Sequence, residues 1–314
     1  MLKNIDPAVD TAVQPHAGVS RGGQPLSYNR SPRADLVPWI GRLYATGVDL
    51  PENYTLQSGL FSDVSCIRIQ LRGDWTAQTA DGPRQHARAA LLFGPNTRVM
   101  PVTVTGSFLS VGIMLRPGSG HALRGMDTSQ LVDRFIFCDA LGIDTDAGMR
   151  QLEACDSPEA MLSALEDIFA DCVKMHGGGE PDPVSTAFEY LSFTDPQASV
   201  ADFAKDMGIS QRQLERIIRR DFGLPPKQML RRARALDMAS HLRGVADAAE
   251  AEDLILRYYD QAQMTREFAE LFGTTPRRFV ATANPILTLA LESRQARRLE
   301  AIARIAPGAQ RPWQ

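Results

Sequence analysis

The residues best suited to chemistry are arginines in a short segment of the C-terminal half. At 100° per residue, Arg212, Arg216 and Arg219 share one side of a helix, and Leu214 and Ile218 share the opposite side. The polar residues that flank this arginine stripe are Gln211, Gln213, Glu215 and Arg220. A helix fits the major groove of a duplex, where Arg pairs with guanine edges and Gln with adenine edges. The pattern therefore predicts a helix face that binds a polyanion.

The local charge supports this interpretation. Residues 211–243 contain nine Lys/Arg and three Asp/Glu, although the whole chain has a formal charge of −3. A local excess of positive charge is the electrostatic footprint of nucleic-acid binding. An ordinary solvated helix face would carry acids among the arginines, and here they are missing from the stripe. We expect Arg216 to contact bases and consider Arg231 a candidate phosphate contact.

The segment that must position these arginines occurs twice, with an offset of fifty residues. The first copy begins at Ser210 and ends in Phe222-Gly223, and the second begins at Asp260 and ends in Phe272-Gly273. In each copy a capping residue is followed three places later by Gln, which is the pattern that closes a helix N-terminus. The terminal Gly suits a left-handed C-cap, and the Pro three residues later forbids continuation of the helix.

A further short helix is expected before the first copy. Ser199 is a capping residue, Phe203 and Ala204 supply an apolar side, and Gly208 permits a sharp turn before Ser210. Helix, short glycine turn and second helix form the helix-turn-helix pattern. One such copy would fit an ordinary helical hairpin equally well, but two copies in the same register favour paired DNA-binding units.

Residues from about 182 to 285 resemble the DNA-binding domain of the AraC-type transcriptional regulators. The matching positions are Ala204–Gly208, Ile209-Ser210, Leu214, Arg216, Phe222-Gly223, Pro226, Arg234-Ala235 and Leu242, then Tyr258–Ala262, Arg266, Phe268, Phe272-Gly273 and Thr275-Pro276. The resemblance implies seven helices, with two helix-turn-helix units joined by a linker helix around 227–243. It implies DNA-facing roles for Arg212, Glu215 and Arg216, and for Gln261, Gln263, Thr265 and Arg266.

The second unit is expected to bind more weakly. Residues 249–285 contain four basic and six acidic residues, so this half attracts phosphate less. Three positions also depart from the family pattern. Arg257 stands where the family has Gly, and Glu252 and Asp253 stand where it has an apolar pair.

The upstream part of the chain has a different composition and periodicity. Residues 1–33 are rich in Pro, Gly, Ser, Gln and Arg, which predicts a flexible arm. Ile67, Ile69 and Leu71 alternate with polar residues, and similar short strands separated by Gly/Pro turns continue to about residue 120. We therefore expect an antiparallel barrel or sandwich, followed by helices. Four cysteines lie far apart, and neither a secretory signal nor a membrane-spanning run is visible, which predicts a cytoplasmic protein.

This upstream part resembles the cupin-like sensor domain that often precedes an AraC-type DNA-binding domain. The resemblance rests on Leu92–Pro95 and on Gly112–Leu115 with Arg116–Gly118. It implies a small-molecule effector or a homodimer contact. The aromatic residues that could line a cavity are Trp39, Trp75, Phe93 and Phe108, although buried aromatics are more often part of the core.

Two other classes of protein stay open. A metal-dependent cupin enzyme would need a His-x-His pair, which the five histidines do not form, and no GxSxG, P-loop or GxGxxG motif is present. An interaction protein that has lost DNA binding is the other alternative. We therefore expect no catalytic residues, metal or cofactor.

The expected organisation is α+β, with a β-rich cupin-like domain ahead of an all-α domain. The boundaries are a flexible arm at 1–33, the cupin-like domain at 34–177, a linker at 178–183, the DNA-binding domain at 184–285 and a helical tail at 286–314. The protein is expected to be a bacterial-type, sequence-specific regulator that binds double-stranded DNA. It would read two successive major grooves about 34 Å apart.

Overall fold

The computed structural model describes residues 6–250 and 261–314 of the chain. Its first half is built on a nine-stranded sheet in which every described strand pairing is antiparallel. The strands are β1 (Gln14–Pro15), β2 (Tyr28–Arg30), β3 (Ile40–Asp49), β4 (Thr55–Leu60), β5 (Cys66–Thr79), β6 (Gly82–His86), β7 (Ala89–Phe93), β8 (Met100–Leu115) and β9 (Phe135–Phe137).

The two long strands β5 and β8 form the centre of the sheet and pair with each other. The first part of β8 also pairs with β4, and its second part pairs with β3. The pairing of β5 with β8 shifts register on either side of Arg72, which is the irregularity that bends a strand. The sheet therefore curves and has a concave and a convex face.

Side-chain alternation sends neighbouring residues to opposite faces. Leu43 and Ile69 pack on the convex face against α2 (Thr145–Glu153) and α3 (Pro158–Met175). Val48 and Trp75 belong to a separate cluster on the concave face. The short helix η1 (Ala34–Leu36) joins β2 to β3, and α1 (Ser119–Arg124), η2 (Thr128–Leu131) and η3 (Cys138–Leu141) lie between β8 and α2.

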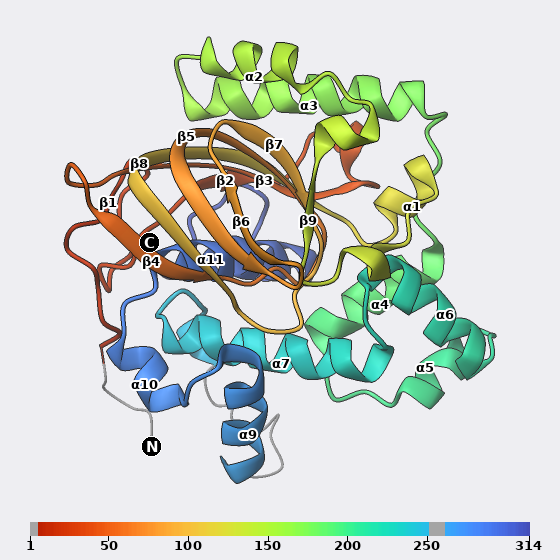
Figure 1. Ribbon diagram of the computed structural model, residues 1–314. Helices are drawn as coiled ribbons and strands as arrows, with labels where there is room; N and C mark the ends of the chain where they lie inside the picture. Colours follow the sequence, from red (N-terminus) through yellow and green to blue (C-terminus); the bar gives the residue numbers. More distant parts are fainter. Residues whose placement is uncertain (1–5, 251–260) are drawn as a thin grey trace.

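The second half of the described chain is helical, which confirms the predicted α+β organisation. Its elements are α4 (Pro183–Thr194), α5 (Val200–Asp206), α6 (Gln211–Phe222), α7 (Pro226–Leu242), η4 (Ala248–Glu250), α9 (Gln261–Phe272), α10 (Pro276–Ala281) and α11 (Pro285–Ala301). The helices α4–α6 and the pair α9–α10 lie near the two ends of α7 in Figure 1. The departures from the family pattern at Glu252, Asp253 and Arg257 lie outside the described residues.

The last helix, α11, lies inside the molecule. It packs between the concave side of the sheet and α7, so that the layers run α2–α3, sheet, α11, α7 (Figure 1). Its arginines Arg294, Arg297 and Arg298 are at most 5% exposed. The helical tail predicted at 286–314 is thus the element that joins the sheet domain to the helical domain.

The flexible arm predicted at 1–33 is instead packed on the protein over its described part. β1 and β2 pair with β3, and Gln24 is 1% exposed. The backbone N–H of Arg21 donates to the carbonyl of Trp313 at 3.0 Å. The C-terminal residues therefore contact the N-terminal segment. Extended polar residues need no apolar run to be ordered when a neighbouring strand satisfies their backbone groups.

Candidate nucleic-acid interface

Local capping fixes the start and the end of α6. The Ser210 hydroxyl accepts a hydrogen bond from the Gln213 backbone N–H at 3.2 Å, and the Ser199 hydroxyl caps α5 in the same way through Asp202. Gly208 turns the chain between the two helices with φ of +67°, and Gly223 ends α6 with φ of +79°. These positive φ values favour glycine. The first helix-turn-helix forms as the sequence predicted.

A compact aromatic core holds α6 in place. Leu214, Ile217 and Ile218 are at most 4% exposed and face α4, α5 and α7. The ring of Phe188 on α4 contacts the ring of Phe222 with centroids 5.5 Å apart. The buried side of α6 is therefore rigidly supported, and its other side is free to meet a partner.

The outward side of α6 carries most of the residues that the sequence singled out. The exposed residues are Gln211, Arg212, Gln213, Glu215, Arg216 and Arg219. Within the described residues, the three arginines form no ion pair. Their guanidinium groups are available to a ligand rather than committed to the protein.

Several other cations of residues 211–243 have structural roles, so the sequence count overstated the free charge. Arg232 and Arg243 are 1% exposed, and burial lowers the pKa of both to about 10. Arg220 donates to Asp221 at 2.6 and 2.7 Å, and Arg234 contacts Glu267 at 3.3 Å. Among residues 211–243, the exposed cations that form no ion pair with any described residue are Arg212, Arg216, Arg219 and Lys227.

Arg231, the candidate phosphate contact, is also committed within the protein. Its Nη2 contacts Glu270 at 2.6 Å and its Nε contacts Glu267 at 3.3 Å. Both carboxylates lie on α9, so the arginine joins α7 to the second unit. These ion pairs make the charge of Arg231 less available to phosphate than that of the stripe arginines, and a phosphate contact by Arg231 stays a prediction.

The second unit presents fewer free groups. Arg266 on α9 is exposed, whereas Gln263 and Thr265 are partly buried and have partners within the protein. The Gln263 amide donates to Glu267 at 3.3 Å. The side chain of Gln261 lies outside the described residues. The exposed Arg266 is the α9 residue that most resembles the α6 stripe.

The sheet domain reaches the edge of α6. A surface depression lies between α6 and the α1–η2 segment, and its lining includes Arg216, Arg219, His121, Asp127 and Ser129. Gly223 at the end of α6 touches this segment closely, because a Cβ there would lie 2.8 Å from Val132. The stripe is thus exposed but has the sheet domain as a direct neighbour.

A second cavity lies between the concave face of the sheet and α11. Of the four aromatics proposed to line a cavity, Trp75 and Phe108 do so. Trp39 instead packs on the convex face and donates its indole N–H to the Gly179 carbonyl at 2.7 Å. Phe93 lies in the concave core outside the lining.

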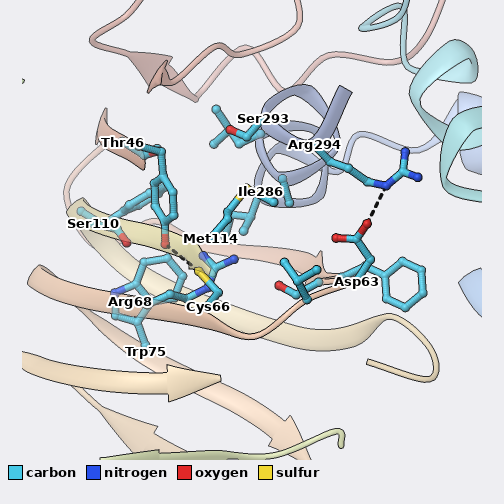
Figure 2. A pocket seen from close by; sticks show the side chains of 17 residues that line it. Thr46, Asp63, Cys66, Arg68, Trp75, Ser110, Met114, Ile286, Ser293 and Arg294 are labelled. Atoms are coloured by element: carbon cyan, nitrogen blue, oxygen red, sulfur yellow. Dashed lines mark hydrogen bonds and ion pairs between the residues drawn. The ribbon is translucent and has the colours of Figure 1, made fainter. Parts of the chain in front are cut away.

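Two cationic residues of this cavity, Arg68 and Arg294, were not indicated by any sequence pattern (Figure 2). Arg68 alternates with Ile67 and Ile69 along β5, which made it look like a solvent-facing residue. Both faces of the sheet are in fact covered, so the polar side of this strand turns inward. No cluster of three or more His, Cys, Asp or Glu suited to a metal occurs among residues 6–250 and 261–314.

Comparisons with known proteins agree with this architecture. Residues 203–282 match a family described as a helix-turn-helix domain, and residues 28–137 match a domain family of unknown function. No protein with a curated description matches the chain at a significant level.

Solved structures with a similar arrangement include ToxT from Vibrio cholerae O395, at 10% identity and a TM-score of 0.44 over 89% of this chain and 99% of that one. ToxT from strain SCE256 with a bound unsaturated fatty acid is 12% identical, with a TM-score of 0.43 over 76% and 94%. The AraC-like transcriptional activator CuxR is 13% identical, with a TM-score of 0.27 over 67% and 86%.

A helix-turn-helix domain joined to a separate β-sheet domain defines a DNA-binding transcription regulator. The match to the helix-turn-helix family covers residues 203–282, which include α6 with its arginine stripe. A search of the described helices finds none with the length and apolar character needed to cross a bilayer.

Proposed function

We propose that this protein is a sequence-specific regulator that reads the major groove with the exposed side of α6. The observation that carries this proposal is a set of three exposed arginines, Arg212, Arg216 and Arg219, that form no ion pair with residues 6–250 or 261–314 and lie on a capped and core-supported helix. Unpaired guanidinium groups on a rigid helix suit bidentate contacts with guanine. In this proposal Gln211, Gln213 and Glu215 contribute further base contacts.

The second unit has a supporting part in this proposal. Arg266 contacts DNA in the next major groove, with Gln261, Gln263 and Thr265 around it. The ion pairs of Arg231 and Arg234 with Glu267 support this part, because they tie α9 to the same linker helix that carries α6. Arg220 supports the N-terminal end of α4 through Asp182 and Asp221 rather than contacting bases.

The sheet domain is the control element in this proposal, and it acts in the cytoplasm through a small-molecule effector or a homodimer contact. Its contacts with the C-terminal half support such a role. The α1–η2 segment borders the arginine stripe, and α11 packs on both the sheet and α7. A structural change in the sheet domain would therefore alter the positions of the helices that contact DNA.

The test begins with selection of bound duplexes from a random library by the full-length chain. We expect Arg216→Ala to weaken the selected duplex by about 1–3 kcal/mol and to relax preference at one position. Lys227→Ala removes an exposed cation outside the stripe, so it should weaken all sequences alike if it touches phosphate. Arg150→Ala on α2, at the far end of the molecule in Figure 1, is the matched control that removes one exposed charge.

Fluorescence anisotropy over a range of salt concentrations measures these effects. DNA binding predicts affinity that falls steeply with salt. An equal loss of affinity for every duplex in the Arg216 and Lys227 variants would show that base reading was misassigned. No binding of any duplex at low salt would overturn the proposed function.

A further inference from the structure

The cavity below α11 has a lining unlike that of an ordinary core. Strands β3, β5 and β8 form its floor, and Ile286, Leu289, Ser293 and Arg294 of α11 form its roof (Figure 2). Its volume is about 50 Å³, enough for a few water molecules. The cavity is therefore closed by the helix that also packs on α7.

Arg68 is a cation in this cavity without a counter-charge. Its Nε atom is shielded from solvent and has no hydrogen-bond partner, and within the described residues the side chain forms no ion pair. Its guanidinium lies 5.6 Å from the ring centre of Tyr44 and 5.5 Å from that of Phe93. Arg68 is partly buried, and a shielded donor on a cation that has no partner is costly, so a site that keeps one suits an anion.

The neighbouring ionisable groups do not supply that anion. Burial raises the pKa of the Tyr44 phenol and of the Cys66 thiol, so both are uncharged at neutral pH. Asp63 is the one carboxylate of the lining, and its Oδ2 already accepts from Arg294 Nε at 2.8 Å. The charge of Arg68 is left for a bound molecule.

The remaining walls show what kind of anion fits. Trp75, Phe108 and Phe61 present aromatic surfaces to the cavity. The indole Nε1 of Trp75 also has no hydrogen-bond partner, and the Trp75 residue is 7% exposed. Aromatic walls suit a planar apolar body, and unpaired N–H donors suit the oxygens of a carboxylate.

Arg294 connects the cavity to the linker helix. Its Nε and Nη1 bind Asp63 and Asp237 at 2.8 and 2.7 Å, and its Nη2 has no partner. Asp63 precedes β5, whereas Asp237 lies on α7. A molecule larger than a few waters must push α11 outward, and that movement would disturb the contact with α7.

We propose that this cavity is the effector site and that it takes a small aromatic monocarboxylate, whose carboxylate pairs with Arg68 and whose ring lies beside Trp75 under α11. This inference rests on the proposed function, in which the sheet domain controls DNA binding. The single charge of the ligand balances the single uncompensated charge of the site. The displacement of α11 links occupancy to the helices that meet DNA.

The test uses the full-length chain with benzoate, 4-hydroxybenzoate and cinnamate, and with benzamide as the neutral match to benzoate. Isothermal titration calorimetry measures affinity, and tryptophan fluorescence reports contact with Trp75. We expect at least one acid to bind and benzamide to bind at least about tenfold more weakly, since a charge-assisted pair is lost. Equal affinity for benzoate and benzamide, or no binding of any of the three acids, would overturn the proposal.

Two variants locate the site. Arg68→Met should weaken binding of the acid about tenfold or more, whereas Arg72→Met, on the same strand with a side chain 53% exposed, should leave it unchanged. Trp75→Phe keeps an aromatic wall but removes the N–H, so it should weaken binding less. Undiminished binding by the Arg68 variant would place the acid elsewhere and refute the assignment.

DNA binding, measured separately by anisotropy, distinguishes the two proposals. Binding of DNA without binding of any acid would leave the proposed function intact and remove the effector site. Binding of an acid without binding of DNA would remove the proposed function. An acid that binds at Arg68 but leaves DNA affinity unchanged would refute its role as effector.

Discussion

Substitution of Arg294 should be among the most destabilising single changes in the chain. Arg294 is 3% exposed and binds two carboxylates, of which Asp237 is fully buried and Asp63 has a side chain that is 13% exposed. Although burial opposes charge on Asp63, Arg294 and Arg232 keep the pKa of this carboxyl below its ordinary value. Arg294→Met therefore leaves both carboxylates short of a partner.

The magnitude follows from this loss. Removing one partner of a buried ion pair costs about 3–5 kcal/mol, because the other charge stays buried and uncompensated. Such a loss is a large part of the stability of an ordinary protein, which is about 5–15 kcal/mol. The double variant Arg294→Met/Asp237→Asn should lose less than the sum of the two single variants, since they share one interaction.

Urea denaturation followed by circular dichroism and tryptophan fluorescence measures the free energy of unfolding. The matched control is Arg304→Met, whose guanidinium is 41% exposed and contacts Asp247 at 2.6 Å. An exposed pair of this kind contributes about 0–1 kcal/mol. If the Arg294 variant were no less stable than the Arg304 variant, the inference that ion pairs of α11 hold the sheet domain and the helical domain together would be wrong.

The remaining predictions concern pH and local capping. Burial, with Arg68 and Arg84 nearby, lowers the pKa of His86 to about 4 from its ordinary 6.5. Between pH 6.5 and about pH 4, the imidazole of His86 is protonated in the unfolded chain but neutral in the folded protein. The free energy of unfolding therefore falls as the pH falls through this range. Urea titrations at pH 7 and pH 4.5 measure how much stability each protein loses on acidification. The loss should be about 1–2 kcal/mol smaller in His86→Phe than in the unsubstituted protein, a figure reduced because His86 is partly exposed. Equal losses in the variant and the unsubstituted protein would contradict this prediction. Ser210→Ala removes the α6 cap and should cost about 1 kcal/mol of unfolding free energy, whereas Ser210→Asp should retain most of it; an equal loss in both would show that the cap contributes nothing.

Local patterns predicted the first helix-turn-helix because all its determinants lie within a few residues of one another. The Ser210 cap, the Gly208 turn and the apolar face of Leu214 and Ile218 are all found in the structure. The free charge of the stripe was harder to predict. Arg231 looks like the stripe arginines in sequence, and only its contact with α9 reveals that its charge is less available.

The position of α11 could not be predicted from local patterns. The sequence predicted a helical tail here without indicating the partners of its arginines. Their partners are acids far away in sequence, such as Glu189 for Arg297 and Glu250 for Arg298. No spacing rule links residues so distant, so the interdomain joint and the cavity beneath it became visible only in three dimensions.

Residues 1–33 show the same limit in another form. Their composition is that of a disordered segment, yet Asn29 is 6% exposed, donates to Glu292 of α11 at 2.8 Å and accepts from Arg311 at 2.7 Å through its carbonyl. The interactions that order this segment come from strand β3 and from the opposite end of the chain. Composition indicates how much surface a segment can bury by itself, whereas residues 1–33 are buried over their described part by contacts with other segments of the chain.

The meeting of both chain ends around α11 has a consequence for how the protein is made. The strands of the sheet precede α11 in the chain, so the sheet is synthesised before the helix that forms the roof of its concave face. Contacts between residues so far apart in sequence form slowly, because the entropy of closing a long loop is lost before the contacts stabilise the chain. Until α11 has been made, the apolar concave face of the sheet is uncovered, and a variant from which α11 (Pro285–Ala301) is deleted would leave that surface exposed.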